Sequence, residues 1–137
     1  MIVADTGAVL ALLDADDRHH AALRALFEER PSAWLLPWAI LPEVDYLAHT
    51  QLGERTAELF RGDLAAGAFV IEWGTEGDLD RAHALNGRYR ALHLGLVDAV
   101  VMAIAERRRA EAIATLDLRH FSTVRLRSTP KLVPRDL

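Results

Sequence analysis

Four acidic residues occupy positions where a folded chain rarely places a charge. Two of them follow short apolar runs typical of buried strands, and two interrupt the apolar faces of helical segments: Asp5, Asp117, Glu43 and Asp98. Carboxylates that converge in a partly dry site repel one another unless cations neutralise them. Neither helical face carries a Lys or Arg that could do this. Because Mg²⁺ and Mn²⁺ prefer oxygen ligands, the pattern predicts a divalent-metal site, which could activate a water for phosphodiester cleavage.

Asp5 and Asp117 are positioned by the strands that precede them. Asp5 directly follows the apolar run 2–4, and one residue separates Asp117 from the run 112–115. Both side chains should therefore emerge at the carboxyl edge of a buried parallel sheet. That edge is where open α/β sheets hold their ligands.

Glu43 and Asp98 are positioned by helical periodicity. Within residues 38–52 an apolar stripe repeats at helical spacing, and Glu43 lies within about 60° of it at roughly 100° per residue. Asp98 lies in the middle of the apolar face of residues 95–109. Both carboxylates are predicted to point inward, where a charge needs a partner.

Strand-like and helical signals alternate along the chain, which favours a parallel sheet covered on both faces. Strands are expected near residues 2–5, 34–36, 68–71 and 112–115, with an edge strand at 121–126 before a Pro-containing tail. Helices are expected at about 7–13, 17–29, 38–52, 54–66, 77–92 and 95–109. No repeat or linker divides the sequence, so we expect one α/β domain over residues 1–137.

The composition narrows the function classes. The 137 residues carry 16 Lys and Arg against 20 Asp and Glu, so nucleic-acid binding must rest on local positive charge. The absence of Cys excludes disulfides, thiol nucleophiles and thiolate zinc sites, and it fits a cytoplasmic location. Because the N-terminus lacks a basic leader and no apolar run is long enough to span a bilayer, we expect neither a signal peptide nor a membrane anchor.

Four short motifs, in this order and spacing, resemble the PIN-domain ribonucleases, and within that family the VapC-type toxins of bacterial toxin–antitoxin pairs. The motifs are residues 2–6 (IVADT), 41–44 (LPEV), 96–99 (LVDA) and 115–121 (TLDLRHF). The resemblance covers essentially the full chain. It implies a three-layer α/β/α sandwich around a parallel sheet of about five strands.

The resemblance also implies roles for individual residues. The acidic quartet corresponds to the family's catalytic metal ligands: Asp5, Glu43, Asp98 and Asp117. Two hydroxyl positions accompany the first and last acids: Thr6 and Thr115. Independently of the resemblance, residues near the acids in sequence could contact RNA phosphates: Arg119, His120, Arg88 and Arg90.

The implied activity is that of a Mg²⁺- or Mn²⁺-dependent endoribonuclease that cleaves RNA in the cytoplasm. Members of the VapC type are held inactive by a cognate VapB-type antitoxin, whose C-terminal segment occupies the active-site groove. The resemblance further implies a homodimer, with apolar surface near the Glu43 helix as a candidate interface.

Other interpretations stay open. Asp5 could simply cap the helix that follows it, and His120 could serve packing. The chain could be a catalytically idle module that uses the same fold to bind RNA or a protein. A receiver-like phosphorylation switch also places acids at strand ends, but it needs a Lys near the site, and the only Lys, Lys131, lies in the tail. Tryptophans are expected in the core or an interface rather than stacked on bases: Trp34, Trp38 and Trp73.

Overall fold

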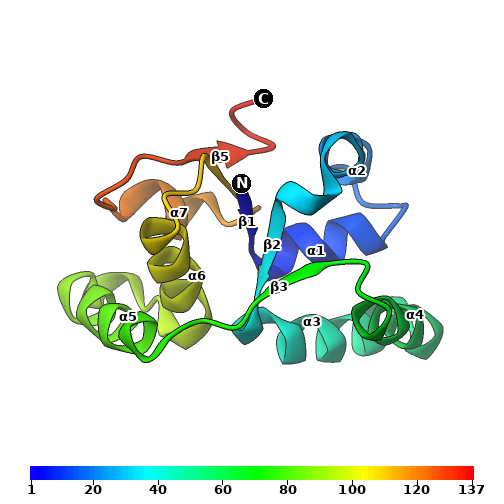
Figure 1. Ribbon diagram of the computed structural model, residues 1–137, viewed down its shortest axis with the longest axis horizontal. Coiled ribbons are helices and arrows are strands. Elements are labelled where there is room, and N and C mark those ends of the chain that lie inside the picture. Colours follow the sequence, from blue (N-terminus) through cyan, green and yellow to red (C-terminus); the bar gives the residue numbers. More distant parts are fainter.

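A five-stranded parallel sheet forms the centre of the computed structural model, which describes residues 1–137 (Figure 1). The strands are β1 (Ile2–Ala4), β2 (Trp34–Pro37), β3 (Val70–Glu72), β4 (Ala112–Ala114) and β5 (Lys131–Val133). Their spatial order is β3-β2-β1-β4-β5, and every neighbouring pair is parallel. In the centre, Ile2 of β1 aligns with Trp34 of β2 and with Ala112 of β4.

Helices cover both faces of the sheet, with α1 to α4 on one side and α5 to α7 on the other (Figure 1). They are α1 (Thr6–Leu13), α2 (His20–Glu29), α3 (Leu41–Leu47), α4 (Glu54–Ala65), α5 (Glu76–Arg88), α6 (Gly95–Arg107) and α7 (Leu118–Thr123). Single 3-10 turns precede β2, α3 and α6, and a π-helical turn, Ala48–Leu52, follows α3. The expected three-layer α/β/α architecture is confirmed. None of these helices has the length and apolar character that crossing a bilayer requires.

Helix α6 lies against the middle of the sheet and contacts β1 and β2. Every residue from Ala99 to Ala105 is buried. A helix that is apolar on all sides is stabilised by packing, because it has no polar face to turn to solvent. Asp98, in the first turn of α6, is therefore carried by one of the most enclosed elements of the fold.

The three tryptophans differ in their surroundings. Trp34 is buried at 1% exposure, with its ring centroid 5.5 Å from that of Phe27 in an edge-to-face contact. Its predicted place in the core is confirmed. Trp38 is partly buried against the core, whereas Trp73 is 74% exposed, so a role for Trp73 at an interface stays a prediction.

The expected edge strand at residues 121–126 is wrong, because α7 occupies much of this segment. Asp117 caps the helix, since its Oδ1 accepts a hydrogen bond from the amide of His120 at 3.1 Å. The hydroxyl of Thr123 donates to the carbonyl of Arg119, four residues earlier, at 2.7 Å. Residue types that favour strands are thus accommodated in a short capped helix.

The fifth strand lies instead inside the Pro-containing tail. Lys131–Val133 pairs in parallel with β4, and Leu132 and Val133 are buried. Three residues between Pro130 and Pro134 are too few to show a periodic pattern, and prolines argue against a strand interior. Residues 131–133 form a strand because they pair with β4, which is distant in sequence.

Replacing Leu132 by Ala should lower the free energy of unfolding by about 2–4 kcal/mol, because the change leaves a cavity between β5 and the core. Leu137→Ala is the matched control, since that side chain is 67% exposed and its loss should change the stability by less than about 0.5 kcal/mol. Urea unfolding followed by circular dichroism measures both variants. Equal stability of the two variants would mean that β5 does not pack as described.

Candidate active site

The carboxyl ends of β1 and β4 lie where the strand order of the sheet reverses. The chain passes from β1 to β2 and β3 on one side, then crosses to β4 and β5 on the other. Ligands of open parallel sheets bind at such a switch point, because the connections diverge there and leave a crevice. Asp5 directly follows β1, and its amide donates to the carbonyl of Ala114 at the end of β4 at 2.9 Å. The structure thus joins the first and last motifs.

Asp5 is the most enclosed of the four acids, at 5% exposure. Its Oδ1 accepts a hydrogen bond from the amide of Thr6 at 2.8 Å, and its Oδ2 accepts one from the hydroxyl of Thr115 at 2.9 Å. Asp5 is therefore the N-cap of α1, as the simpler interpretation proposed. Helix capping requires neither burial nor a second hydrogen-bond partner. The burial of Asp5 and its bond to Thr115 therefore indicate a further role for this carboxylate.

Thr115 connects two of the acids. Besides donating to Asp5, its hydroxyl accepts a hydrogen bond from the amide of Asp117 at 3.0 Å, and the residue is buried. Thr115 thereby fixes both the Asp5 side chain and the start of the turn into α7. Thr6, the other predicted supporting residue, donates its amide to Asp5, while its buried hydroxyl has no hydrogen-bond partner.

Asp98 and Asp117 meet at His120. The Nδ1 atom of His120 lies 2.6 Å from Oδ2 of Asp98 and 3.0 Å from Oδ2 of Asp117. One ligand atom from each of the three residues lies within 4.8 Å of the others, close enough to hold one metal ion. The sequence predicted His120 only as an RNA contact or a packing residue. Because His120 follows Asp117 by three residues, about one helical turn, this spacing could have predicted their contact.

Glu43 is not one of these three residues, but it lies near enough to Asp98 to act on it through its charge. It lies in the first turn of α3, is half-buried, and its charge is one cause of the raised pKa of Asp98. None of the four acids forms an ion pair with Lys or Arg, and His120 is their only ionic partner. The four carboxylates therefore carry an excess of negative charge.

This crowding changes the proton affinities of the cluster. Burial and the charge of Asp98 raise the pKa of Asp5 to about 7, although its hydrogen bonds from Thr6 and Thr115 act in the opposite direction. Burial also raises the pKa of Asp98, and the hydrogen bond from His120 offsets part of this increase. The pKa of His120 is raised, chiefly by its hydrogen bond to Asp98.

The donor set suits a hard divalent cation. It offers carboxylate oxygens, an unpaired threonine hydroxyl and no thiol, which matches the preference of Mg²⁺ and Mn²⁺ for oxygen. A cation would also relieve the repulsion that raises the pKa of Asp5. The geometry is consistent with a metal site, and the assignment of the individual ligands stays a prediction.

Of the predicted RNA contacts, His120 lies inside the cluster and the three arginines lie outside it. Arg119 in α7 and Arg90 in the turn before α6 are exposed, and their side chains form no hydrogen bond or ion pair within the chain. Arg88, at the end of α5, lies with its guanidinium 5.5 Å from the centroid of the Tyr89 ring. Arg90 and Arg119 are therefore available to bind phosphate, and this role also stays a prediction.

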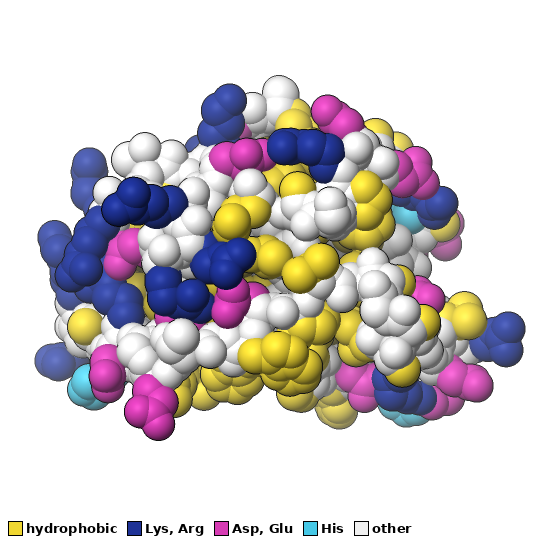
Figure 2. All heavy atoms as spheres, viewed as in Figure 1, with side chains coloured by type: hydrophobic (Ala, Val, Ile, Leu, Met, Phe, Trp, Pro, Cys, Tyr) yellow, Lys and Arg dark blue, Asp and Glu magenta, His cyan; other side chains and the backbone are white.

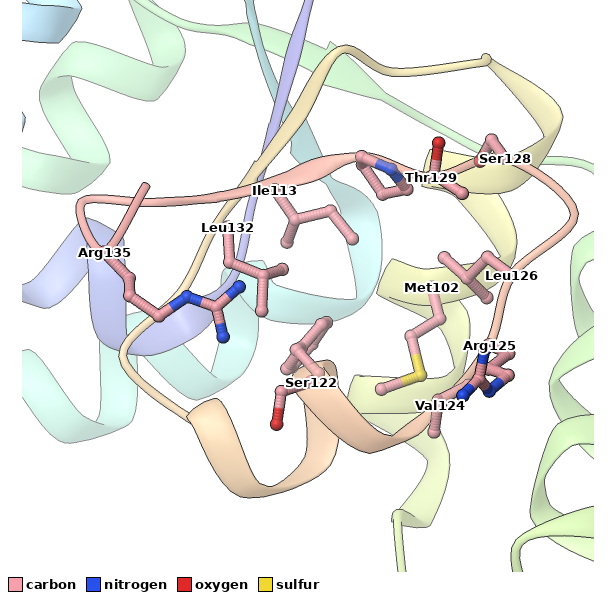
Figure 3. Close-up of a pocket in the computed structure, with 12 residues that line it drawn as sticks. Met102, Ile113, Ser122, Val124, Arg125, Leu126, Ser128, Thr129, Leu132 and Arg135 are labelled. Carbon is pink, nitrogen blue, oxygen red and sulfur yellow. The ribbon is translucent and has the colours of Figure 1, made fainter. Parts of the chain in front are cut away.

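A separate cavity of about 370 Å³ lies between α6, α7 and β5 (Figure 3). Met102 and Leu132 form part of its apolar wall, and Arg125 and Arg135 lie on opposite sides of it. None of the four acids lines this cavity. It is therefore not part of the carboxylate cluster.

Comparison with known proteins gives a consistent result. The family model described as PIN domain matches residues 2–126. Ribonuclease VapC26 of Mycobacterium tuberculosis (strain ATCC 25618 / H37Rv) is 31% identical over 124 residues, which are 90% of this chain and 92% of the relative.

Two solved structures have a similar fold. The structure of Mycobacterium tuberculosis VapC20, described as a sarcin-ricin loop cleaving toxin, has a TM-score of 0.78 and 21% identity, covering 89% of this chain and 93% of that chain. A chain of VapBC2 from Rickettsia felis, bound to a DNA fragment from their promoter, has a TM-score of 0.70 and 12% identity, covering 96% of this chain and 97% of that chain.

In the presence of a chelator, the free energy of unfolding should fall as the pH rises from about 5 to about 8. Asp5, Asp98 and His120 all have raised pKa values in the folded protein, so over this interval the folded state binds more protons than the unfolded state. For Asp5 the loss runs from its unfolded value of 3.8 to about 7. Between pH 5 and about 8, Asp5 should lower the free energy of unfolding by roughly 2–3 kcal/mol.

Chemical denaturation at the two pH values, first with chelator and then with Mg²⁺, measures this effect. Mg²⁺ should restore stability chiefly at the higher pH, where the carboxylates are charged. Asp5→Asn removes one titrating group and should flatten the dependence on pH in chelator. An unchanged slope in that variant would contradict the raised pKa of Asp5.

Proposed function

Because the chain belongs to the PIN-domain family, we propose that it is a Mg²⁺- or Mn²⁺-dependent endoribonuclease and the toxin of a toxin–antitoxin pair. The observation that carries the proposal is the convergence of carboxylates at the switch point of the sheet. There, burial together with the charges of Asp98 and Asp117 raises the pKa of Asp5. The 31% identity to a ribonuclease over nearly the full chain supports RNA as the substrate.

The cluster would hold the cation and keep the site ordered. When bound, the ion supplies a water of lowered pKa and stabilises the charge that develops at phosphorus during hydrolysis. The quartet would provide its oxygen ligands: Asp5, Glu43, Asp98 and Asp117. Thr115 holds Asp5 in place through the hydrogen bond to Oδ2, so the carboxylate keeps one orientation. No side chain is required as a covalent nucleophile.

His120 balances the charge of the cluster. Its raised pKa favours the protonated imidazole, which neutralises part of the charge of Asp98 and Asp117 in the metal-free protein. Arg90 and Arg119 would bind phosphates that flank the scissile bond, because Arg90 lies in the turn before the Asp98 helix and Arg119 follows Asp117 by two residues.

The surface beside the acids suits a protein inhibitor. Leu96 is 56% exposed two residues before Asp98, and Leu118 is 39% exposed directly after Asp117. These two side chains would offer a protein partner apolar contacts next to the carboxylates in sequence. We propose that a VapB-type antitoxin covers them and the carboxylates together, which would block RNA in the cytoplasm until the antitoxin is lost.

A homodimer is proposed through α3 and α4. Tyr46 on α3 is 66% exposed and Leu59 on α4 is 55% exposed. They place apolar surface near the Glu43 helix, where the sequence predicted an interface. A second copy of the chain would remove this surface from water.

Asp98→Asn should reduce cleavage of a mixed structured RNA by at least about a hundredfold, because the change removes a charged ligand from the site. The purified protein is assayed with Mg²⁺, with Mn²⁺ and with chelator. Asp80→Asn is the matched control, since Asp80 is an exposed acid of α5 without an ion pair. It should cleave like the wild type.

Two results of the assay would contradict the proposal, the first for the role of Asp98 and the second for the nuclease activity itself. Wild-type activity in a well-folded Asp98→Asn protein would remove Asp98 from the catalytic site. Absence of cleavage under every condition, with RNA or partner binding that needs no metal, would instead favour the idle binding module.

Thr115→Val should weaken Mg²⁺ binding by about 10- to 100-fold, because Asp5 and the Asp117 amide lose the hydroxyl that connects them. The side chains are nearly equal in shape, so the sheet should remain intact. The midpoint of the Mg²⁺-dependent rise in unfolding temperature measures the affinity. Thr56→Val on α4 is the control and should leave this midpoint unchanged, because Thr56 is partly buried and forms no hydrogen bond with any of the four acids.

A further inference from the structure

Positive charge is concentrated in the C-terminal part of this acidic chain. Residues 107–137 contain eight Lys and Arg against three Asp and Glu, a net charge of +5, whereas residues 1–106 have a net charge of −9. Lys and Arg side chains gather on the left of Figure 2, where Figure 1 places α5, α6 and the loop after α7. A local surface of this sign attracts polyanions even though the whole molecule is negative.

Within this region an open cavity of about 720 Å³ lies at the end of α6 opposite to Asp98. Four arginines line it: Arg81, Arg107, Arg109 and Arg127. Two acids line the same wall, Asp78 and Glu106, and the formal charge of the lining is therefore positive. We call this the arginine cavity.

Two of these arginines are held rigidly by carboxylates. Nε and Nη2 of Arg107 lie 2.7 Å and 3.0 Å from the two oxygens of Asp78, and Nε and Nη2 of Arg81 lie 2.7 Å and 3.3 Å from those of Glu106. In both guanidinium groups Nη1 has no partner within the chain. These donors are therefore oriented before any ligand binds, which lowers the entropy lost on binding.

The other two arginines are unpaired but anchored through their backbone. The side chains of Arg109 and Arg127 are exposed and form no hydrogen bond or ion pair. The amide of Arg127 donates to Oε2 of Glu106 at 2.6 Å, and the amide of Arg109 donates to the carbonyl of Glu106 at 3.1 Å. Glu106 therefore accepts hydrogen bonds from three of the four arginines, from one side chain and two backbone amides.

The residues that line the arginine cavity favour a phosphate group over a nucleobase. It contains no aromatic side chain, and Ala103 is its one apolar residue, so a nucleobase would find no surface on which to stack. Guanidinium groups recognise phosphate oxygens through charge and N–H donors alone. Ser128, in the same wall, has a buried hydroxyl without a hydrogen-bond partner and offers one more donor.

We propose that the arginine cavity binds a backbone phosphate of the RNA substrate at a distance from the catalytic carboxylates. This inference rests on the proposed nuclease function. Arg107 follows Asp98 by nine residues on α6, or about 14 Å along the helix axis, so only an RNA that extends several nucleotides beyond the scissile bond reaches it. An open cavity holds a single phosphate weakly, but the tethered phosphate of a longer RNA benefits from a high effective concentration.

The test compares two charge-removing variants. Arg109→Gln combined with Arg127→Gln removes two exposed side-chain charges that form no hydrogen bond or ion pair, so the unfolding temperature should stay close to that of the wild type. Arg55→Gln, which removes one charge, is the control for position, because Arg55 is an exposed, unpaired arginine of α4 on the other side of the sheet. Fluorescence anisotropy in chelator measures the dissociation constant of a single-stranded RNA of about 30 nucleotides at several salt concentrations.

We expect the double variant to raise this dissociation constant at least about tenfold at about 0.1 M salt. The slope of log affinity against log salt should become less steep by about 0.7 for each phosphate that the protein no longer binds. Arg55→Gln should change neither quantity. Equal dissociation constants and slopes in the double variant and the control would overturn the proposal.

Two further outcomes separate this proposal from others. Unchanged RNA binding in the double variant, together with abolished binding of an acidic peptide, would assign the cavity to a protein partner and overturn the RNA site. RNA binding in chelator does not require catalysis. Binding that depends on these arginines, without any cleavage in Mg²⁺, would therefore support the phosphate site and refute the nuclease.

Discussion

Carboxylates that repel one another are held together where β1 and β4 end and α6 begins. Asp5 is buried beside Asp98 and Asp117, and its pKa is raised to about 7. An amide, a hydroxyl and one imidazole offset only part of the charge. Such a cluster persists only if the surrounding frame holds the groups together more strongly than they repel. The fully buried strand β1 and the helix α6, packed on all sides, provide that frame.

Helix α6 also separates the two signs of charge. Asp98 lies in its first turn and Arg107 in its last, an arrangement that suits the helix dipole, which favours anions at the N-terminus and cations at the C-terminus. The same helix therefore carries an acidic site at one end and a basic cavity at the other. The two sites keep a fixed separation because the residues between them form the core.

Much of this arrangement follows from local sequence, and the remainder depends on contacts between distant segments. The inward positions of Glu43 and Asp98 follow from the helical period, because neighbouring apolar residues define the buried face. The hydrogen bond between Thr115 and Asp5 joins residues 110 positions apart, so no local pattern contains it. Strand β5 is too short to show alternation, and the arginine cavity draws on side chains from α5, α6 and the loop after α7. These features require the folded chain.

The place of β5 has a consequence for aggregation. The region that matches the PIN-domain model ends at residue 126, whereas β5 covers Lys131–Val133. A protein shortened to the matched region would leave β4 as the outermost strand, with three buried apolar residues and one row of unpaired backbone groups. A strand of that kind is a template for pairing with other chains. The last residues therefore protect the sheet from joining its neighbours, with Lys131 placing a charge on the outer strand.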